Sequence, residues 1–298
     1  MQSDSLNSKL CIFGEVLFDH FPDGKSVLGG APFNVAWHLQ AFGLAPLFIS
    51  QVGDDEQGRS IRQAMTQWQM DTSALNTDTQ HATGRVDIKF INNEPEYDIV
   101  SPCAWDSISH RQVDAAQACD FLYHGSLALR HTHNRKLIEN MKHCEAQSVL
   151  LDVNLRSPWW NREQVLHMVT QCDWLKLNID EFNLLYPSDA SLRVRMQSLI
   201  KQNGLQGVIL TRGSAGAELM SANGDWHQVT PDHKVEIIDT VGAGDAFTAV
   251  IIAGLIRQWP IQQTLQRAQL FASMIVGQRG ATVTERSFYQ TFIQQWSL

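Results

Sequence analysis

The alternation of short apolar runs with amphipathic stretches is the feature that most constrains the fold of this chain. In the stretches between the runs, apolar residues recur every three or four positions, which is the spacing of a helix with one buried face. Strands that alternate with such helices favour a parallel sheet, so we predict an α/β fold with a doubly wound, mainly parallel sheet flanked by helices. The predicted strands are Leu10–Phe13, Leu47–Val52, Phe121–His124, Val149–Val153, Trp174–Leu177 and Val208–Thr211.

One segment departs from this pattern. Between Arg85 and Phe90 apolar residues alternate with charged ones, Asn92 and Asn93 supply a turn, and the alternation resumes at Tyr97. A period of two predicts a half-exposed antiparallel hairpin rather than another buried parallel strand. Such a hairpin is either an edge hairpin without a functional role or a lid over a ligand.

The charge balance and the cysteines narrow the class of protein. The 298 residues include 23 Lys and Arg against 31 Asp and Glu, a net charge of -8, which argues against a nucleic-acid-binding surface. No segment reaches the roughly 18 apolar residues of a membrane span, and the first residues lack the features of a signal peptide. Five cysteines without CxxC spacing argue against a zinc ribbon or a disulfide framework. We therefore expect a cytoplasmic protein that binds neither nucleic acid nor a membrane.

The run Asp-Thr-Val-Gly-Ala-Gly-Asp-Ala-Phe-Thr, from Asp239 to Thr248, is the most informative stretch for function. Gly242 and Gly244 permit a tight turn at the start of a predicted helix, whose N–H groups and dipole attract an anion. Asp245 lies beside that anion position, where a carboxylate repels the ligand unless it has a task such as accepting a proton from a hydroxyl. The alternative is that Asp245 only stabilises the helix N-terminus.

A second glycine-rich run, Gly29-Gly30-Ala-Pro-Phe-Asn34, precedes the first predicted helix, and Asp19 follows the first predicted strand. Paired glycines allow a ligand to approach the backbone closely, and Asp19 and Asn34 would suit a polyol, although either could also be a cap. Neither GxxxxGK[ST] nor GxGxxG after a strand occurs, which argues against a P-loop NTPase and against a nicotinamide cofactor.

Polar residues also follow four of the predicted strands. The carboxyl ends of strands in an open α/β sheet share one edge, where such sheets bind ligands, so we expect a single site there. The four clusters are His124 to Ser126; Asp152, Asn154 and Arg156; Asn178 and Glu181; and Thr211 and Gly213.

Together these motifs resemble those of the ribokinase-like (PfkB) carbohydrate kinases, and the resemblance spans nearly the whole chain. Within the family, the GGAPxNVA run together with D-x-N-x-R is similar to the branch of fructokinases and 2-keto-3-deoxygluconate kinases. The matching residues are Gly29, Gly30 and Asn34 (GG-x-x-x-N), Asp239 to Asp245 (D-T-x-G-A-G-D), Asn178 and Glu181 (N-x-x-E), and Thr211, Gly213 and Gly216 (T-x-G-x-x-G).

The resemblance implies a single kinase domain over residues 1–298, with the segments of a small β-sheet lid inserted near 14–28 and 83–101. It implies that Asp245 is the base in an ATP-dependent, Mg²⁺-requiring phosphorylation of a sugar hydroxyl. It also implies that Gly242, Ala243 and Gly244 form an anion hole, and that sugar is bound by Asp19, Gly29, Gly30, Asn34 and Arg156. Asn178 and Glu181 would bind Mg²⁺ and phosphate through water, and the nucleotide would be bound by Thr211, Gly213, Gly216, Ala272 and Val276. Asp239 and Val241 lie where some members of the family bind a monovalent cation such as K⁺.

Two departures from the family bear on the substrate. Phe33 occupies a position where many relatives carry a small residue, and it either reshapes the sugar pocket or packs inward. The return strand of the lid carries Asp98 where kinases of keto-acid sugars have a basic residue, so we expect a neutral sugar, with fructose first. Arg156 could still meet a carboxylate, so 2-keto-3-deoxygluconate kinase, or another ribokinase-like sugar or nucleoside kinase, stays as the alternative.

The expected partners are ATP and a small sugar, and the lid could also join two copies of the chain in a homodimer. An alternative of another class is a catalytically silent sugar-binding protein on the same fold. The intact Asp245 and its flanking glycines argue against that alternative.

Overall fold

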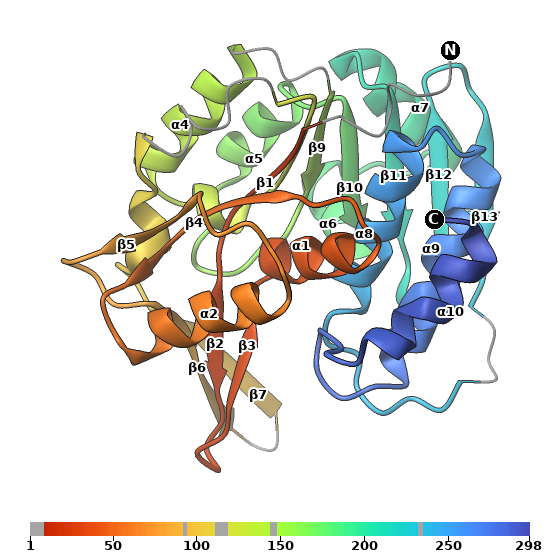
Figure 1. The fold of residues 1–298 in the computed structure, drawn as a ribbon. Coiled ribbons are helices and arrows are strands. Elements are labelled where there is room, and N and C mark those ends of the chain that lie inside the picture. Colours follow the sequence, from red (N-terminus) through yellow and green to blue (C-terminus); the bar gives the residue numbers. More distant parts are fainter. Residues whose placement is uncertain (1–8, 92–93, 111–118, 144–147, 232–234) are drawn as a thin grey trace.

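The structure, a computed structural model, describes residues 9–91, 94–110, 119–143, 148–231 and 235–298 (Figure 1). Nine strands form one sheet in the order β13-β12-β11-β10-β9-β8-β1-β4-β5, and all neighbours from β11 to β5 are parallel. The predicted doubly wound, mainly parallel sheet is confirmed. The strands are β1 (Leu10–Phe13), β4 (Leu47–Gly53), β5 (Leu75–Asp78), β8 (Phe121–Gly125), β9 (Ser148–Asp152), β10 (Trp174–Asn178), β11 (Gly207–Thr211), β12 (Ala217–Ser221) and β13 (Trp226–Val229).

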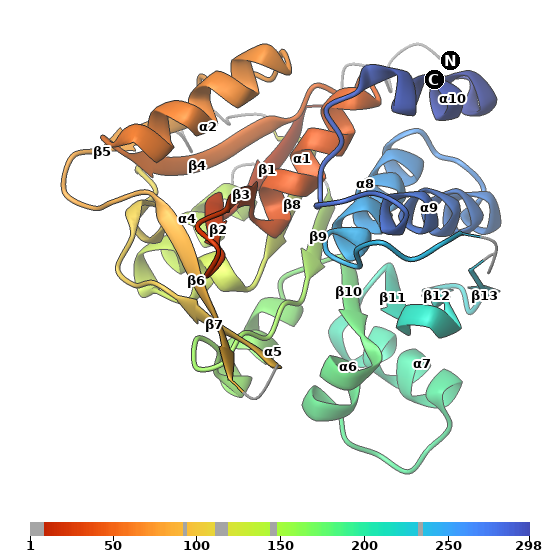
Figure 2. The same cartoon turned by 90° about the horizontal axis from the view of Figure 1, so that it is seen from below.

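Helices cover both faces of this sheet, as Figure 2 shows. Buried residues of α1 (Ala31–Ala41), α2 (Glu56–Gln67), α8 (Ala243–Ile256), α9 (Ile261–Val276) and α10 (Arg286–Trp296) belong to one hydrophobic cluster. Those of the helices on the other face belong to a second cluster. These helices are α4 (Thr132–His143), α5 (Arg162–Val169), α6 (Ile179–Leu185) and α7 (Leu192–Asn203).

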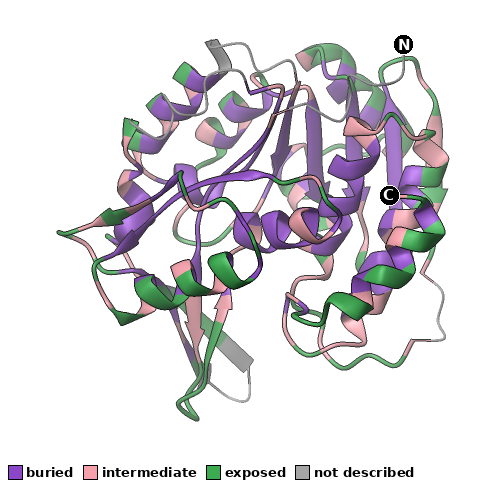
Figure 3. Cartoon of the chain, viewed as in Figure 1, coloured by how far each residue is buried: buried purple, intermediate pink, exposed green. Residues whose placement is uncertain are grey.

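Strand β1 shows why the central strands read as unbroken apolar runs. Leu10 and Ile12 belong to one cluster, whereas Cys11 and Phe13 belong to the other. Successive side chains of a strand point to opposite faces, so a strand covered on both faces needs apolar residues at every position. Figure 3 shows the result, with buried central strands and helices that are exposed on their outer sides.

A smaller sheet projects from the large one, in the order β3-β2-β6-β7 (Figure 1). In β6, Val86 and Ile88 are buried while Arg85 and Lys89 are exposed, which confirms the alternation predicted from the sequence. The predicted turn at Asn92-Asn93 lies outside the described residues. The strands are β2 (Leu17–His20), β3 (Ser26–Gly29), β6 (Gly84–Ile91) and β7 (Glu94–Ile99).

Some elements differ from the sequence prediction. Strands β12 and β13 extend the sheet in the antiparallel sense beyond β11, and β5 adds a parallel strand beside β4 at the other edge. None of these three strands was predicted. Helix α1 begins at Ala31 rather than near Phe33, because Pro32 in the first turn needs no hydrogen-bond partner for its nitrogen. Phe33 is fully buried against Trp37 and Phe48, so it packs inward and does not reshape a pocket. Among the described helices, none is long and apolar enough to cross a lipid bilayer.

Candidate active site

The polar residues that follow the parallel strands meet at one edge of the large sheet. Strands β1, β8, β9, β10 and β11 run in the same direction, so their carboxyl ends share this edge. The first turns of α1 and α8 lie at the same edge, where Asn34 and Asp245 are hydrogen-bonded to each other. The small sheet is next to it, because β2 directly follows β1 and β3 directly precedes α1.

The turn that leads into α8 requires glycine at its first position. Gly242 has φ of +79°, and a Cβ there would lie 2.4 Å from the Cα and Cβ of Ala281. Helix α8 has no side-chain cap, and Gly244 in its first turn is exposed. N–H groups at an uncapped helix N-terminus are suited to holding an anion.

Asp245 lies in this first turn and connects α8 to α1. The Nδ2 of Asn34 donates a hydrogen bond of 2.8 Å to the Oδ2 of Asp245 across 211 residues of sequence. Burial, and to a lesser extent the negative charge of Asp152, raise the pKa of Asp245 from 3.8 to about 7 against the lowering effects of Asn34, Lys176 and Arg156. A carboxyl with such a pKa can exchange a proton near neutral pH, which is the property of a general base.

Buried polar groups connect α8 to the large sheet. The Nζ of Lys176 in β10 lies 2.8 and 2.7 Å from the two carboxylate oxygens of Asp152 at the end of β9. The Oγ1 of Thr248 in α8 lies 2.8 Å from the Oδ2 of Asp152 and 2.9 Å from the carbonyl oxygen of Gly244. These contacts connect the centre of the sheet to the turn that carries Asp245.

Glu15 is a further carboxylic acid at this edge. It is 1% exposed, and its Oε2 has no hydrogen-bond partner within the described part of the chain. Burial, and to a lesser extent the charge of Asp245, raise its pKa from 4.5 to about 7 against the lowering effects of Arg130 and Arg156. Asp245 and Glu15 therefore influence each other's protonation.

The residues expected to bind sugar come from β2, from the end of β3, from the turn before α1, from α1 and from the loop after β9. Gly30 has φ of +110°, and a Cβ there would lie 2.6 Å from the carbonyl oxygen of Glu15, so the two segments can approach only because this residue is glycine. A Cβ at Gly29 would lie 3.3 Å from the Oδ2 of Asp19. Burial raises the pKa of Asp19, and Arg156 lowers it. Since Arg156 also lowers the pKa of Asp245 and Glu15, it lies within electrostatic reach of all three acids.

The position of Asp98 contradicts the charge argument made from the sequence. In the small sheet, Asp19 is in register with Val86, and Val86 is in register with Ile99, so these three side chains share one face. Asp98 is in register with Asp87 and therefore points to the opposite face. Asp98 therefore does not face the side of the sheet that carries Asp19. The sequence alone did not reveal the register between β6 and β7, on which the direction of this side chain depends.

Asn178 and Glu181 form a capping box at the start of α6. The backbone N–H of Glu181 donates to the Oδ1 of Asn178, and the backbone N–H of Asn178 donates to the Oε2 of Glu181, both at 2.9 Å. The Oε1 of Glu181 accepts a 3.1 Å bond from the N–H of Leu155. Burial raises the pKa of Glu181. Each oxygen accepts a single protein donor, which leaves lone pairs for water.

The expected nucleotide-binding residues lie at the end of β11 and beside the C-terminal end of α9. Thr211 ends β11 and Gly213 is exposed, whereas Gly216 and Ala272 are buried. The carbonyl oxygen of Val276 accepts the N–H groups of residues 238 and 239, which attaches the loop before α8 to α9.

Asp239 holds the loop before α8 in place. Its Oδ1 accepts the N–H of Val241 and its Oδ2 accepts the N–H of Gly280, both at 3.0 Å. Val241 is 53% exposed. Both carboxylate oxygens of Asp239 therefore already have a backbone donor.

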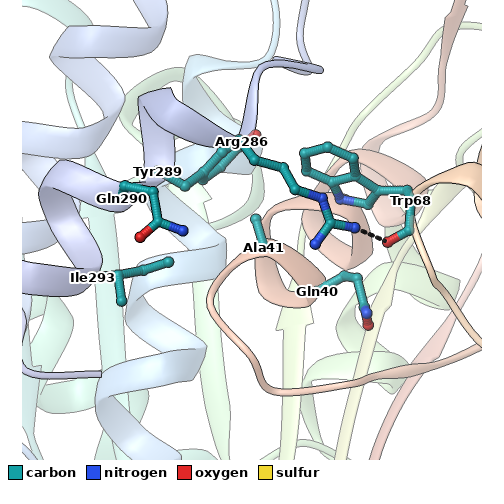
Figure 4. A pocket seen from close by; sticks show the side chains of 7 residues that line it. All are labelled: Gln40, Ala41, Trp68, Arg286, Tyr289, Gln290 and Ile293. Atoms are coloured by element: carbon teal, nitrogen blue, oxygen red, sulfur yellow. Dashed lines mark hydrogen bonds between the residues drawn. The ribbon is translucent and has the colours of Figure 1, made fainter.

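Not every polar residue at the strand ends faces the site. His124 is fully buried, and the Oγ of Ser126 contacts the backbone nitrogen and oxygen of Asn154 at 3.0 Å. These residues fix the neighbouring loop. A recess of about 40 Å³ lies at the C-terminal end of α1, beside Gln40 and Ala41. Figure 4 shows that Arg286 points into it.

Glu15 and Lys176 were not among the site residues inferred from the sequence. A signal existed for both. Glu15 lies in the same Gly14–Asp19 run as the expected sugar ligand Asp19, and Lys176 is a charged residue within the otherwise apolar strand Trp174–Leu177. A charged residue in a buried strand needs a partner of opposite charge, and the sequence does not show which acid supplies it.

Comparisons with known proteins identify the family. A family model described as pfkB family carbohydrate kinase matches residues 7–287. The chain belongs to this family. The kinase is 30% identical over 271 residues to a fructokinase of Klebsiella pneumoniae, across 84% of this chain and 85% of that one. It is 27% identical over 294 residues to aminoimidazole riboside kinase of Salmonella typhimurium, across 92% of this chain and 91% of that one.

A solved structure agrees with the family and the fold. The crystal structure of a fructokinase from Vibrio cholerae O395 matches the kinase with a TM-score of 0.81 at 26% identity, covering 96% of this chain and 99% of that chain. The ribokinase-like fold expected from the motifs is therefore confirmed, and the chain is a carbohydrate kinase.

Gly242→Ala should destabilise the kinase, because the new Cβ would clash with Ala281 and the residue would be held at a positive φ. A non-glycine residue at such a φ costs on the order of 1 kcal/mol before the clash is counted. Gly244→Ala is the matched control, since no heavy atom lies within 4 Å of its Cβ position. Thermal denaturation should give a lower midpoint for G242A than for G244A, and equal midpoints would contradict this account of the turn.

Asp245→Asn should stabilise the kinase at alkaline pH. Because the pKa of Asp245 is raised from 3.8 to about 7 in the folded state, stability falls as the pH rises through this interval. The amide removes that loss, so the thermal midpoint of D245N should exceed that of the wild type at pH 8 and approach it near pH 4. A D245N midpoint at or below the wild type at pH 8 would show that the carboxylate is not disfavoured by burial.

Proposed function

We propose that the kinase transfers the γ-phosphoryl group of ATP to a hydroxyl of a neutral sugar, with fructose as the first candidate. The observation that carries this proposal is the place of Asp245. It is a partly buried carboxyl with a pKa near 7, in the first turn of an uncapped helix, and hydrogen-bonded to Asn34. A proton acceptor beside an anion site is the pair of features that phosphoryl transfer to an alcohol requires.

In this proposal Asp245 accepts the hydroxyl proton as the oxygen attacks the phosphorus. The N–H groups of Gly242, Ala243 and Gly244 hold the transferred phosphoryl group at the helix N-terminus, where charge develops in the transition state. Asn34 orients the Asp245 carboxylate and has its Oδ1 buried without a partner among the described residues, so this oxygen is available to a sugar hydroxyl.

The nucleotide and its metal lie on the β10 and β11 side in this proposal, with Thr211, Gly213, Gly216, Ala272 and Val276 along the nucleotide. Asn178 and Glu181 suit Mg²⁺ only through water, because each of their bonded oxygens already accepts a backbone N–H group. Mg²⁺ would supply neutralisation of the phosphate charge. Asp239 and the Val241 carbonyl are hard oxygen ligands suited to a monovalent cation such as K⁺.

The sugar lies on the other side, against Asp19, Gly29, Gly30, Asn34 and Arg156, with the small sheet as its lid. The Vibrio cholerae fructokinase was crystallised with fructose, ADP and calcium ion, which supports a neutral ketose as the substrate class. Aminoimidazole riboside kinase is almost as similar, and Arg156 could bind a carboxylate, so a riboside or 2-keto-3-deoxygluconate is the alternative.

In this proposal, the face of the small sheet that carries Asp19 closes over the sugar. Tyr97 is in register with Ile88 and so shares the face of Asp19, and it is 53% exposed. The same exposed strands could instead join two copies of the kinase. A carbohydrate kinase of this kind would act in the cytoplasm.

Asp245→Asn should lower kcat with ATP and the preferred sugar about 10²- to 10⁴-fold, because the general base is lost while the fold and the backbone N–H groups stay. Circular dichroism and the thermal midpoint serve as the folding control. A D245N protein with wild-type kcat would refute the assignment of the base.

A coupled ADP-release assay should separate the candidate substrates. We expect the highest kcat/KM with fructose, and lower values with 2-keto-3-deoxygluconate, ribose and aminoimidazole riboside. Turnover of 2-keto-3-deoxygluconate without turnover of fructose would overturn the choice of substrate. Sugar binding by calorimetry without ATP consumption would favour the silent sugar-binding protein.

A further inference from the structure

The Asp152–Lys176 ion pair lies in the core below the turn that carries Asp245. Asp152 is 7% exposed and Lys176 is 6% exposed, and the Nζ of Lys176 bonds both carboxylate oxygens of Asp152. Removing two charges from water costs about as much as their attraction returns, so a buried pair is rarely explained by stability alone. Replacing a buried ion pair by well-packed apolar residues is often neutral or stabilising, so stability alone does not account for this pair.

Thr248 connects this ion pair to the proposed anion hole. Its Oγ1 lies within hydrogen-bond distance of two acceptors, the Oδ2 of Asp152 and the carbonyl oxygen of Gly244. Its single hydroxyl hydrogen can bond only one of them at a time, and the charged carboxylate is the stronger acceptor. Thr248 is fully buried, so water cannot replace Asp152 as its partner. Thr248, one turn after Gly244, thereby attaches the N-terminal part of α8 to the end of β9.

The pair also acts on the charge of Asp245. The groups around Asp245 come from several elements, and they are Asn34 from α1, Tyr123 from β8, Asp152 from β9, Lys176 from β10, Arg156 from the loop after β9, and Glu15 after β1. Asp152 disfavours the anionic form of Asp245, whereas Lys176 and Arg156 favour it. Asp152 and Lys176 thus exert opposite effects on the same carboxyl.

We propose that Asp152, Lys176 and Thr248 are positioning residues for phosphoryl transfer, which hold the first turn of α8 against the sheet and balance the charge around Asp245. None of the three needs to touch the sugar or the nucleotide. This inference rests on the proposed function, because it assigns these residues to the same reaction.

Substitutions of Thr248 test the attachment of the turn. Thr248→Val removes the hydroxyl with little change in shape and should lower kcat about 10- to 100-fold while KM for sugar and ATP changes little, because a small displacement of the base and the N–H groups affects the transition state most. Thr248→Ser keeps the hydroxyl and should restore most of the wild-type kcat.

The matched control is Thr264→Val in α9. Thr264 is 2% exposed, and its Oγ1 donates to the carbonyl oxygen of Pro260 four residues earlier, but no carboxylate of the described residues accepts a hydrogen bond from it. T264V should keep the wild-type kcat. A kcat for T248V equal to that of T248S, or a loss in T264V as large as in T248V, would overturn the proposal.

Substitutions of the ion pair test the charge balance. Asp152→Asn removes an anion near Asp245 and should move the acidic limb of the pH profile of kcat/KM to lower pH. Lys176→Met removes a cation and should move the same limb to higher pH, each by about half a pH unit or more. A purely structural pair would lower activity in both variants without shifts of opposite sign, so equal or absent shifts would overturn the proposal.

A readout without turnover separates this inference from the proposed function. The fall in the thermal midpoint between pH 5 and pH 8 reports the deprotonation of Asp245 together with that of Glu15, and the part of the fall that is absent from D245N belongs to Asp245. It should be smaller in D152N and larger in K176M than in the wild type. If the wild-type chain phosphorylates no sugar but these slopes differ as stated, the proposed function fails and the charge balance stands. If the wild type is active and the slopes do not differ, only this inference fails.

Discussion

The burial of one carboxyl at the start of α8 is the constraint on which the rest of the site depends. Asp245 lies at a helix N-terminus, which attracts an anion. An anion bound there would repel the negative charge of the Asp245 carboxylate. The chain surrounds it with an amide from α1, a cation from β10 and an arginine from the loop after β9. The neighbouring groups have opposing effects on the pKa of Asp245, which therefore lies near neutral pH.

The fold allows these groups to meet around Asp245 because the carboxyl ends of the parallel strands lie at one edge of the sheet. Residues that are far apart in sequence meet there, as Asn34 and Asp245 do across 211 positions. Glycines then allow backbone segments to come closer than any side chain would permit. Gly242 against Ala281 and Gly30 against the Glu15 carbonyl are two such places beside Asp245.

The layout of the fold was readable from the sequence, since the central strands are apolar at most positions and β6 of the small sheet alternates between buried and exposed residues. The turns at Gly29–Gly30 and Gly242–Gly244 were readable because their residue types are unusual. The direction of Asp98 was not, because it depends on the register between β6 and β7. The partnership of Lys176 with Asp152 was not either, because it arises between neighbouring strands whose order the sequence does not state. Antiparallel β12 and β13 were missed because their short, mixed runs lack a clear period.

The small sheet is built wholly from residues 17–99, whereas Lys176, Thr211 and the whole of α8 come later in the chain. Apart from Arg156, the side proposed for the sugar and the side proposed for the phosphate thus come from separate stretches of sequence, and the hydrogen bond between Asn34 and Asp245 joins them. Replacements in the early stretch can alter which alcohol is admitted while leaving the later stretch untouched. In such a division, a lineage can acquire new substrates without having to reinvent its chemistry.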